Sequence, residues 1–269
     1  MVSSVLCNSE TWCNLSKSEL ELIETVDTML LRKLLNTPKT TPKEILFLEL
    51  GINPLREIIR QRRLNFLKYI LDQSADSIMF KVFEKQCKTR TKKDWVTTIL
   101  NDLEELNMNV NFVDIQKMSK EKWKSIIKQT IKEYTFRTLI ERKETHSKVK
   151  DLVYSKFEIQ DYLKPCSQII TRKEIELIFK LRSKMVNIKA NYKGSQKTIE
   201  CSSCNYGEET QEHIYNSCEV LNKEDNEKVY EKPDYKSINT GNIEEKLKVA
   251  QIFMQRMKIH EKYSKEGKS

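Results

Sequence analysis

The sequence predicts an all-α fold, and three observations support this. Only 5 glycines and 5 prolines occur among 269 residues, and a β protein with many turns would contain more of these turn-forming residues. Apolar residues recur at helical spacing in several long stretches. Residues typical of helix starts and ends flank those stretches. We therefore expect an irregular multi-helix bundle, in a chain long enough to enclose a sizeable core.

Three helices are expected in the first third of the chain. Ser16 and Glu19 form a capping-box pattern that opens a helix ending near residue 36. A short helix follows, with Thr41 as its N-cap and Gly51 as its stop. Pro54 opens a third helix, and its exposed side is expected to be strongly cationic because it carries Arg56, Arg60, Arg62, Arg63 and Lys68.

The helical pattern continues to the end of the chain. Further helices are expected at about 77–88, 94–107, 119–146 and 243–260, and from the capping box of Thr171 and Glu174 onward. The organisation predicted from these elements has four parts: a short remnant or disordered start at 1–15, a helical region at 16–165, a basic helix with a cysteine-rich segment at 166–235, and a C-terminal helix with a polar tail at 236–269.

One group of residues indicates specific chemistry. Cys201, Cys204, His213 and Cys218 have the spacing C-x2-C-x8-H-x4-C. The first pair can hold one ion from a tight turn, and the second pair can supply two ligands from a helix that Thr210 caps. Four thiolate and imidazole ligands predict one structural Zn2+, in a small zinc knuckle near the C-terminus, and not a catalytic ion with an open position.

The alternative is that these residues are buried free thiols and an unrelated histidine. Three of the 7 cysteines and one of the 3 histidines fall in this short window, which favours the metal. The other cysteines are isolated and are interpreted as ordinary thiols: Cys7, Cys13, Cys87 and Cys166. An odd number of cysteines without a secretory signal indicates an intracellular, reducing compartment, and no stretch is apolar enough to span a membrane.

Charge is strongly segregated along the sequence. Residues 117–197 contain 21 Lys and Arg against 9 Asp and Glu, whereas residues 200–234 contain 3 against 10. The basic stretch is the expected nucleic-acid surface, with Phe179 and Tyr192 available for stacking on bases. The residues expected to bind are Arg172, Lys173, Arg182, Lys184, Lys189, Tyr192, Lys193 and Lys197. A merely solvated cationic helix face remains the alternative, and the acidic zinc segment is expected to order the chain.

A nuclease-like pattern occurs near the C-terminus. Pro233, Asp234, Glu244 and Lys246 fit PD-x9-E-x-K, in which carboxylates hold a divalent metal in restriction-like endonucleases. The spacing is permissive, and Glu244 falls where acidic residues are ordinary at a helix start. Endonuclease activity is therefore a remote alternative.

Several short motifs occur in order along the chain: Ser9–Trp12, Val26–Asp27, Leu31–Lys33, Thr41–Glu44, Leu48–Gly51, Arg62–Leu67, Asp94–Trp95, Thr171–Glu174, Lys189–Lys193 and the Cys/His cluster with Glu209–His213. Together they resemble the region that follows the polymerase palm in reverse transcriptases of non-LTR retrotransposons. The resemblance covers essentially the whole chain. It implies a post-palm, thumb- or linker-like helical region and a CCHC zinc knuckle that help to hold RNA template and target DNA.

The chain departs from that family in one decisive respect. The Tyr-x-Asp-Asp type box and the other palm aspartate are absent, so we expect no polymerase activity and no small-molecule substrate. The expected function is binding of RNA, DNA or both, and the resemblance implies a nuclear location. A protein-interaction scaffold with a protein partner, or a relic without function, are the alternatives.

Overall fold

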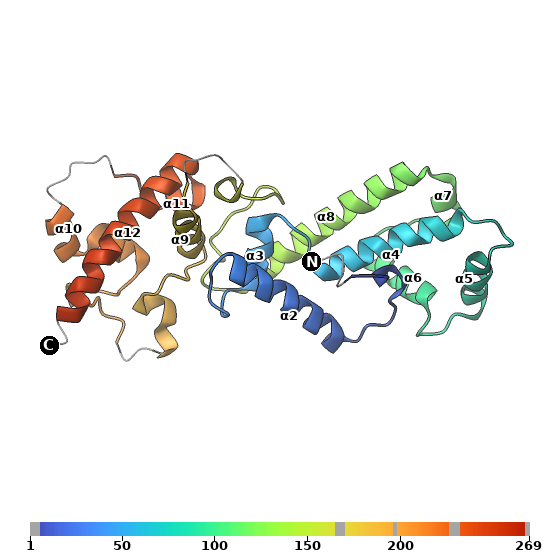
Figure 1. The fold of residues 1–269 in the computed structure, drawn as a ribbon, viewed down its shortest axis with the longest axis horizontal. Coiled ribbons are helices and arrows are strands. Elements are labelled where there is room, and N and C mark those ends of the chain that lie inside the picture. Colours follow the sequence, from blue (N-terminus) through green and yellow to red (C-terminus); the bar gives the residue numbers. More distant parts are fainter. Residues whose placement is uncertain (1–5, 165–169, 196–197, 226–231, 267–269) are drawn as a thin grey trace. The chain divides into compact units, whose positions relative to one another are not determined.

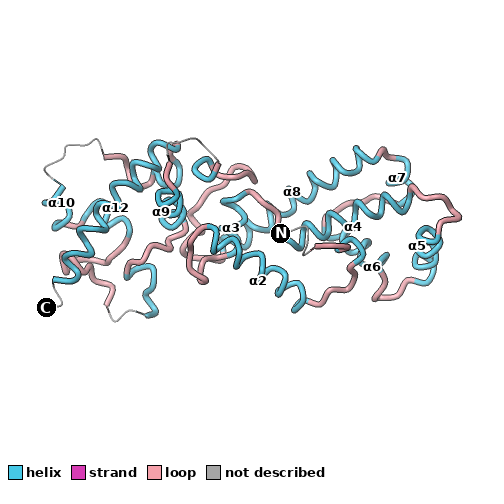
Figure 2. Tube along the Cα trace, in the orientation of Figure 1, coloured by secondary structure: helices cyan, strands magenta, loops and turns pink. Residues whose placement is uncertain are grey.

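The computed structural model describes residues 6–164, 170–195, 198–225 and 232–266, and the all-α prediction is confirmed in them (Figure 1). Figure 2 shows helices joined by loops throughout these ranges, where the extended pairing is limited to one antiparallel bridge between Glu200 and Glu208. The chain divides into two compact units. The first joins residues 1–30 to 52–141, and the second joins residues 31–51 to 142–269.

The first unit is built around three helices. A core of Leu64, Ile99, Trp123 and Ile127 lies between α4, α6 and α8, and the Trp123 indole donates to the Leu64 carbonyl at 2.8 Å. The helices contributing to this unit are α2 (Lys17–Leu34), α4 (Leu55–Leu71), α5 (Ile78–Thr89), α6 (Trp95–Glu105), α7 (Phe112–Lys117) and α8 (Lys120–Glu144), with α2 and α8 shared between the units.

Most of the predicted helix starts are confirmed. Ser16 and Glu19 form their capping box at α2, and Ser77 and Asp94 accept the backbone N–H groups that open α5 and α6. The prediction of Thr41 as an N-cap is wrong. Pro42 occupies that position in an extended conformation, and the Thr41 hydroxyl contacts the Thr37 hydroxyl at 2.5 Å instead.

The prediction of a strongly cationic exposed face on α4 is wrong. Arg60 and Arg63 are buried, and both donate to the Asp102 carboxylate of α6, at 3.1 and 2.8 Å. Arg60 also bonds Glu57 at 2.9 Å. The physical reason is that a buried guanidinium requires paired acceptors, and α6 supplies a carboxylate that the α4 sequence alone does not show.

Of the predicted start segment 1–15, the structure describes residues 6–15, which pack against other parts of the first unit. Leu6 and Ser9 are buried, and a short 3-10 turn, η1 (Ser9–Thr11), follows Leu6. The Trp95 indole donates to the Glu10 carbonyl at 2.8 Å, and Arg62 donates to the Leu6 carbonyl. Side chains distant in the sequence therefore hold this segment, which has no helical period of its own.

The second unit contains the short, buried helix α3 (Lys43–Leu50). Its residues 44–49 are all buried, and the Glu49 carboxylate accepts from Arg182 at 2.9 Å and from the Tyr162 hydroxyl at 2.6 Å. The other helical segments of this unit are η2 (Asp161–Leu163), α9 (Arg172–Arg182), η3 (Lys189–Ser195), η4 (His213–Ser217), α10 (Glu219–Asp225), α11 (Ser237–Thr240) and α12 (Ile243–Glu266).

The division into units differs from the predicted segments. The predicted boundary between residues 165 and 166 lies outside the described residues, and residues 142–164 belong with the C-terminal part of the chain. Residue 51 shows why α3 belongs there too. Gly51 has a φ of +61°, and a Cβ at this position would lie 2.3 Å from the backbone of Glu158. Only glycine allows so close an approach.

Candidate metal centre

The first ligand pair lies in a tight hairpin. The Cys201 N–H donates to the Gly207 carbonyl at 2.9 Å, and the Asn205 N–H donates to the Cys201 carbonyl at 2.9 Å. Asn205 and Gly207 have φ values of +53° and +74°, a conformation that Asn and Gly adopt at least cost. The sequence C-S-S-C-N-Y-G therefore folds Cys204 back toward Cys201.

The second ligand pair lies at the two ends of a π-helical turn. Thr210 accepts the His213 N–H at 3.0 Å, which confirms the predicted cap, and the Cys218 N–H donates to the His213 carbonyl at 2.8 Å. In a regular α-helix, residues five apart point about 140° away from each other. The i to i+5 hydrogen bond of the π turn brings His213 and Cys218 onto one side.

The two pairs converge. The four predicted ligand atoms, from Cys201, Cys204, His213 and Cys218, lie within 4.8 Å of one another. The Cys201 and Cys218 sulfurs are 3.9 Å apart, and the Cys204 sulfur is 3.3 Å from His213 Nε2. This cluster could hold a metal ion. Three sulfurs and one imidazole nitrogen form the donor set that structural zinc sites use.

Hydrogen bonds make the sulfur of Cys201 a favourable site for negative charge. Burial by itself raises the pKa of this thiol, but contacts from His260 and from the backbone of Cys204 and Ser203 outweigh burial and lower the pKa to about 6. Burial raises the pKa of Cys218 to about 12. A bound divalent cation would deprotonate both thiols, because metal ligation requires the thiolate.

A buried carboxylate and imidazole support the hairpin from outside the ligand set. Glu209 accepts the backbone N–H groups of Lys189 and Ser202, both at 2.9 Å, and lies 3.3 Å from His260 Nε2. Burial would raise the pKa of Glu209, but the contacts with His260 and these backbone groups lower it to about 2. The bonds with Cys201 and Glu209 outweigh burial at His260 and raise its pKa to about 9.

The predicted nucleic-acid residues occupy different environments. Arg172 and Lys173 are exposed at the start of α9, and Lys184, Lys189 and Tyr192 are half-buried. Lys189 Nζ donates to the Glu200 carbonyl at 2.7 Å, and Lys148 Nζ lies 5.1 Å from the centre of the Tyr192 ring. Lys193 is in η3, and Lys197 lies outside the described residues.

Two residues have to be removed from the predicted binding surface. Arg182 is 2% exposed, and its guanidinium bonds Glu49 and the carbonyls of Ile238 and Asn239, both at 3.0 Å. Phe179 is fully buried and cannot stack on a base. The error has a physical origin, because α9 turns one face into the core, and an arginine on that face is needed to pair with the buried Glu49.

Sequence reasoning missed two sets of functional candidates. Glu209 and His260 support the hairpin, but His260 is 59 residues from Cys201, and no local pattern links them. On α8, Lys120, Lys124 and Lys128 are exposed, and their four-residue spacing places them in one stripe. That spacing was a usable signal within the basic stretch.

The residues of the nuclease-like pattern and the other described cysteines do not form a second metal site in the described part of the chain. Lys246 Nζ is paired with the Asp161 carboxylate at 2.8 Å, and Glu244 is exposed at the start of α12. Among the described residues, the groups able to hold a metal do not include Asp234 or Glu244. Cys7, Cys13 and Cys87 are free thiols, and Cys166 lies outside the described residues.

Comparison with known families, curated proteins and solved structures finds no match to this chain. In the described part of the chain, no helix combines the length and the apolar character that a membrane crossing requires.

Proposed function

We propose that this chain is a zinc-containing, nucleic-acid-binding protein that corresponds to the post-palm region of a non-LTR retrotransposon reverse transcriptase. In this proposal it binds RNA, DNA or both, inside the cell and in the nucleus, and has no polymerase activity of its own. The sequence motifs suggest the family, and the convergence of Cys201, Cys204, His213 and Cys218 supports the zinc knuckle within it.

The proposal rests mainly on one observation: the start of η3, at Lys189 and Ala190, is hydrogen-bonded to Glu209, which follows the hairpin of Cys201 and Cys204. The Ala190 N–H donates to the Glu209 carbonyl at 3.2 Å, and the Lys189 N–H donates to the Glu209 carboxylate. A metal that folds the hairpin therefore also fixes η3, with its lysines and Tyr192. The knuckle is acidic, so it acts by ordering the cationic segment that meets the phosphates.

A polar pocket of about 450 Å³ lies beside this attachment. Its lining includes Lys148 and Lys184 as well as Glu208, Gln211 and Glu212. This lining offers hydrogen-bond donors and acceptors as well as positive charge. A single-stranded segment can use both, because its base edges are free while its phosphates need cations.

Salt dependence tests the proposal. If Arg172, Lys173, Lys184 and Lys189 neutralise about four phosphates, affinity for duplex DNA or single-stranded RNA should fall roughly 50- to 150-fold between about 50 and 200 mM salt. The double variant Arg172→Gln, Lys173→Gln should lower the slope of log affinity against log salt by about 1 to 2, and the exposed Lys258→Gln should not. Fluorescence anisotropy with labelled oligonucleotides measures both. Absence of binding, or binding indifferent to salt, would contradict the proposal.

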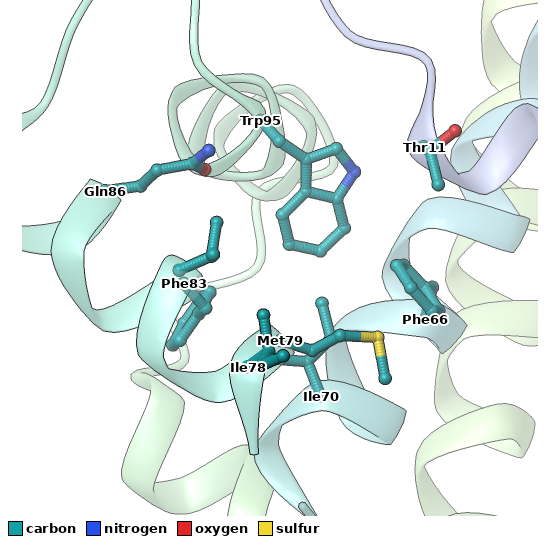
Figure 3. A pocket seen from close by; sticks show the side chains of 9 residues that line it. Thr11, Phe66, Ile70, Ile78, Met79, Phe83, Gln86 and Trp95 are labelled. Atoms are coloured by element: carbon teal, nitrogen blue, oxygen red, sulfur yellow. The ribbon is translucent and has the colours of Figure 1, made fainter. Parts of the chain in front are cut away.

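A second candidate function, a protein-interaction module, is favoured by an apolar pocket in the first unit. Figure 3 shows Phe66, Trp95 and Phe83 around a hollow into which Ile78 and Met79 also point. The pocket measures about 310 Å³, and Ile78 is 81% exposed. Residues 78–93 carry six Lys or Arg against one Glu, so the matching partner is an acidic amphipathic helix.

That candidate has its own test. An acidic amphipathic peptide with apolar anchors should bind the wild type, and Val82→Asp should abolish binding by placing a carboxylate in the apolar pocket. Val113→Asp is the matched control, because Val113 is exposed and does not line the pocket. Equal binding by all three proteins would exclude the pocket as the interaction site.

A further inference from the structure

Two polar side chains of α12 are buried against the metal centre. Arg256 and His260 are 2% and 5% exposed, and their four-residue spacing places them on the same face of the helix. Burying an arginine or a charged histidine is costly unless each donor finds an acceptor. Both side chains find their acceptors in the segment that supplies the metal ligands.

His260 contacts the half of the centre that carries the C-x2-C pair. Its Nε2 lies 3.3 Å from the Glu209 carboxylate, its Nδ1 contacts the Ser203 hydroxyl, and a ring nitrogen lies within 4.8 Å of the Cys201 sulfur. Ser203 lies between Cys201 and Cys204. His260 therefore lies beside a candidate ligand atom and contacts the turn that joins the two cysteines.

Arg256 contacts the half that carries the H-x4-C pair. It donates to the carbonyls of Ile214 and Tyr215 at 2.9 and 2.6 Å, and to the Asn222 side chain at 2.8 Å. Ile214 and Tyr215 lie inside the π turn. A π turn interrupts the regular α-helical hydrogen-bond pattern, so its carbonyls benefit from an outside donor. α12 thus contacts both ligand pairs.

We propose that α12 is a latch on the metal centre, and that His260 is a positioning residue that holds the turn between Cys201 and Cys204 through its contacts with Ser203 and Glu209. This inference rests on the proposed metal centre. Metal binding holds the hairpin and the π turn in the arrangement that presents acceptors to His260 and Arg256. Without the metal these acceptors are not held together, and the last turns of α12 separate from the hairpin, because unpaired buried donors are better solvated in water.

His260 also belongs to a second group, with Cys201 and Glu209, whose ligand atoms lie within 4.8 Å of one another. Two observations favour a supporting role over direct ligation. The Glu209 oxygens already accept the N–H groups of Lys189 and Ser202. The group provides three donors, whereas the set with Cys204, His213 and Cys218 provides the four of a closed site.

Cobalt(II) is a suitable probe, because its thiolate charge-transfer band reports the electron density on the ligating sulfurs. The wild type, His260→Ala, His260→Gln and the exposed control Lys258→Ala should each bind one cobalt per chain. Loss of the contacts with Ser203 and Glu209 in His260→Ala should release the turn between Cys201 and Cys204, shift the band, and speed cobalt release to a chelator on the order of 10- to 100-fold. His260→Gln keeps an N–H donor and should restore part of both effects.

Hydrogen exchange on the whole chain tests the latch itself. Amides in residues 253–266 should exchange faster after the metal is removed from the wild type. In Arg256→Gln the same amides should exchange faster than in the wild type even when the metal is bound. An unchanged band and release rate in His260→Ala, or exchange in α12 that does not respond to the metal, would overturn the inference while leaving the metal centre standing. If His260→Ala loses the metal and His213→Ala retains it, His260 is a ligand and the inference fails. A wild type that takes up no cobalt would overturn the metal centre as well.

Discussion

Glu49 shows how much of this fold depends on single buried charges. Its carboxylate is fully buried and is satisfied by Arg182, Tyr154 and Tyr162. Glu49→Ala leaves the Arg182 guanidinium buried without its carboxylate partner. We therefore expect the free energy of unfolding of the second unit to fall by about 3 to 5 kcal/mol. Hydrogen exchange of the α9 amides measures this loss. The exposed Glu158→Ala is the control, and an equally small effect of both variants would contradict the role given to Glu49.

Asp27 provides a pH test in the first unit. Burial raises its pKa to about 6, against the effect of the Leu55 N–H that it accepts at 3.3 Å. Its contribution to stability is therefore fully present below about pH 4, the pKa range of an unfolded aspartate, and is lost as the pH rises through 6. Asp27→Asn keeps an acceptor for Leu55 without the charge.

We expect Asp27→Asn to stabilise the first unit by about 1 to 2 kcal/mol at pH 7.5 and to have little effect at pH 4. Denaturant unfolding followed by tryptophan fluorescence is the measurement. The exposed Glu21→Gln serves as the control. If Asp27→Asn raises the free energy of unfolding by the same amount at both pH values, burial of the charged Asp27 carboxylate is not the cause of the stabilisation.

At the scale of elements, the hairpin and the π turn set the geometry of the candidate metal centre. Gly207 has a φ of +74°, and a Cβ there would meet only the His213 ring at an ordinary 3.6 Å. Gly207→Ala should therefore act through backbone strain of about 1 to 2 kcal/mol and weaken zinc binding roughly 5- to 30-fold. Competition with a chromogenic chelator measures this. Asn205→Gly relieves strain of the same kind at another residue with positive φ. A comparable loss of zinc affinity in that variant would refute backbone strain as the explanation.

The elements also show what can be predicted from the sequence. The capping patterns at Ser16 and Thr171 act within a few residues, and the structure confirms these helix starts. The convergence of Cys201, Cys204, His213 and Cys218 was predictable because their spacing is local. The burial of Arg60 and Arg182 was not, since their partners are Asp102 and Glu49, 42 and 133 residues away. The π turn was also not predictable, because periodicity does not distinguish it from an α-helix.

At the scale of the whole molecule, the two units can be observed separately. All three tryptophans, Trp12, Trp95 and Trp123, are in the first unit, and the four candidate metal ligands are in the second. Zinc removal should therefore leave the tryptophan emission unchanged while it increases hydrogen exchange in residues 198–225. A shift of the emission maximum on chelation, reversed by zinc, would show that the metal also controls the first unit.

The central claim is that Cys201, Cys204, His213 and Cys218 hold one zinc ion, and native mass spectrometry of the purified chain tests it most directly. The wild type and the control Cys87→Ser should each carry one zinc, and Cys204→Ser should carry none or lose it to a mild chelator. A wild type without zinc, or a Cys204→Ser variant that retains one zinc as firmly as the wild type, would contradict the account.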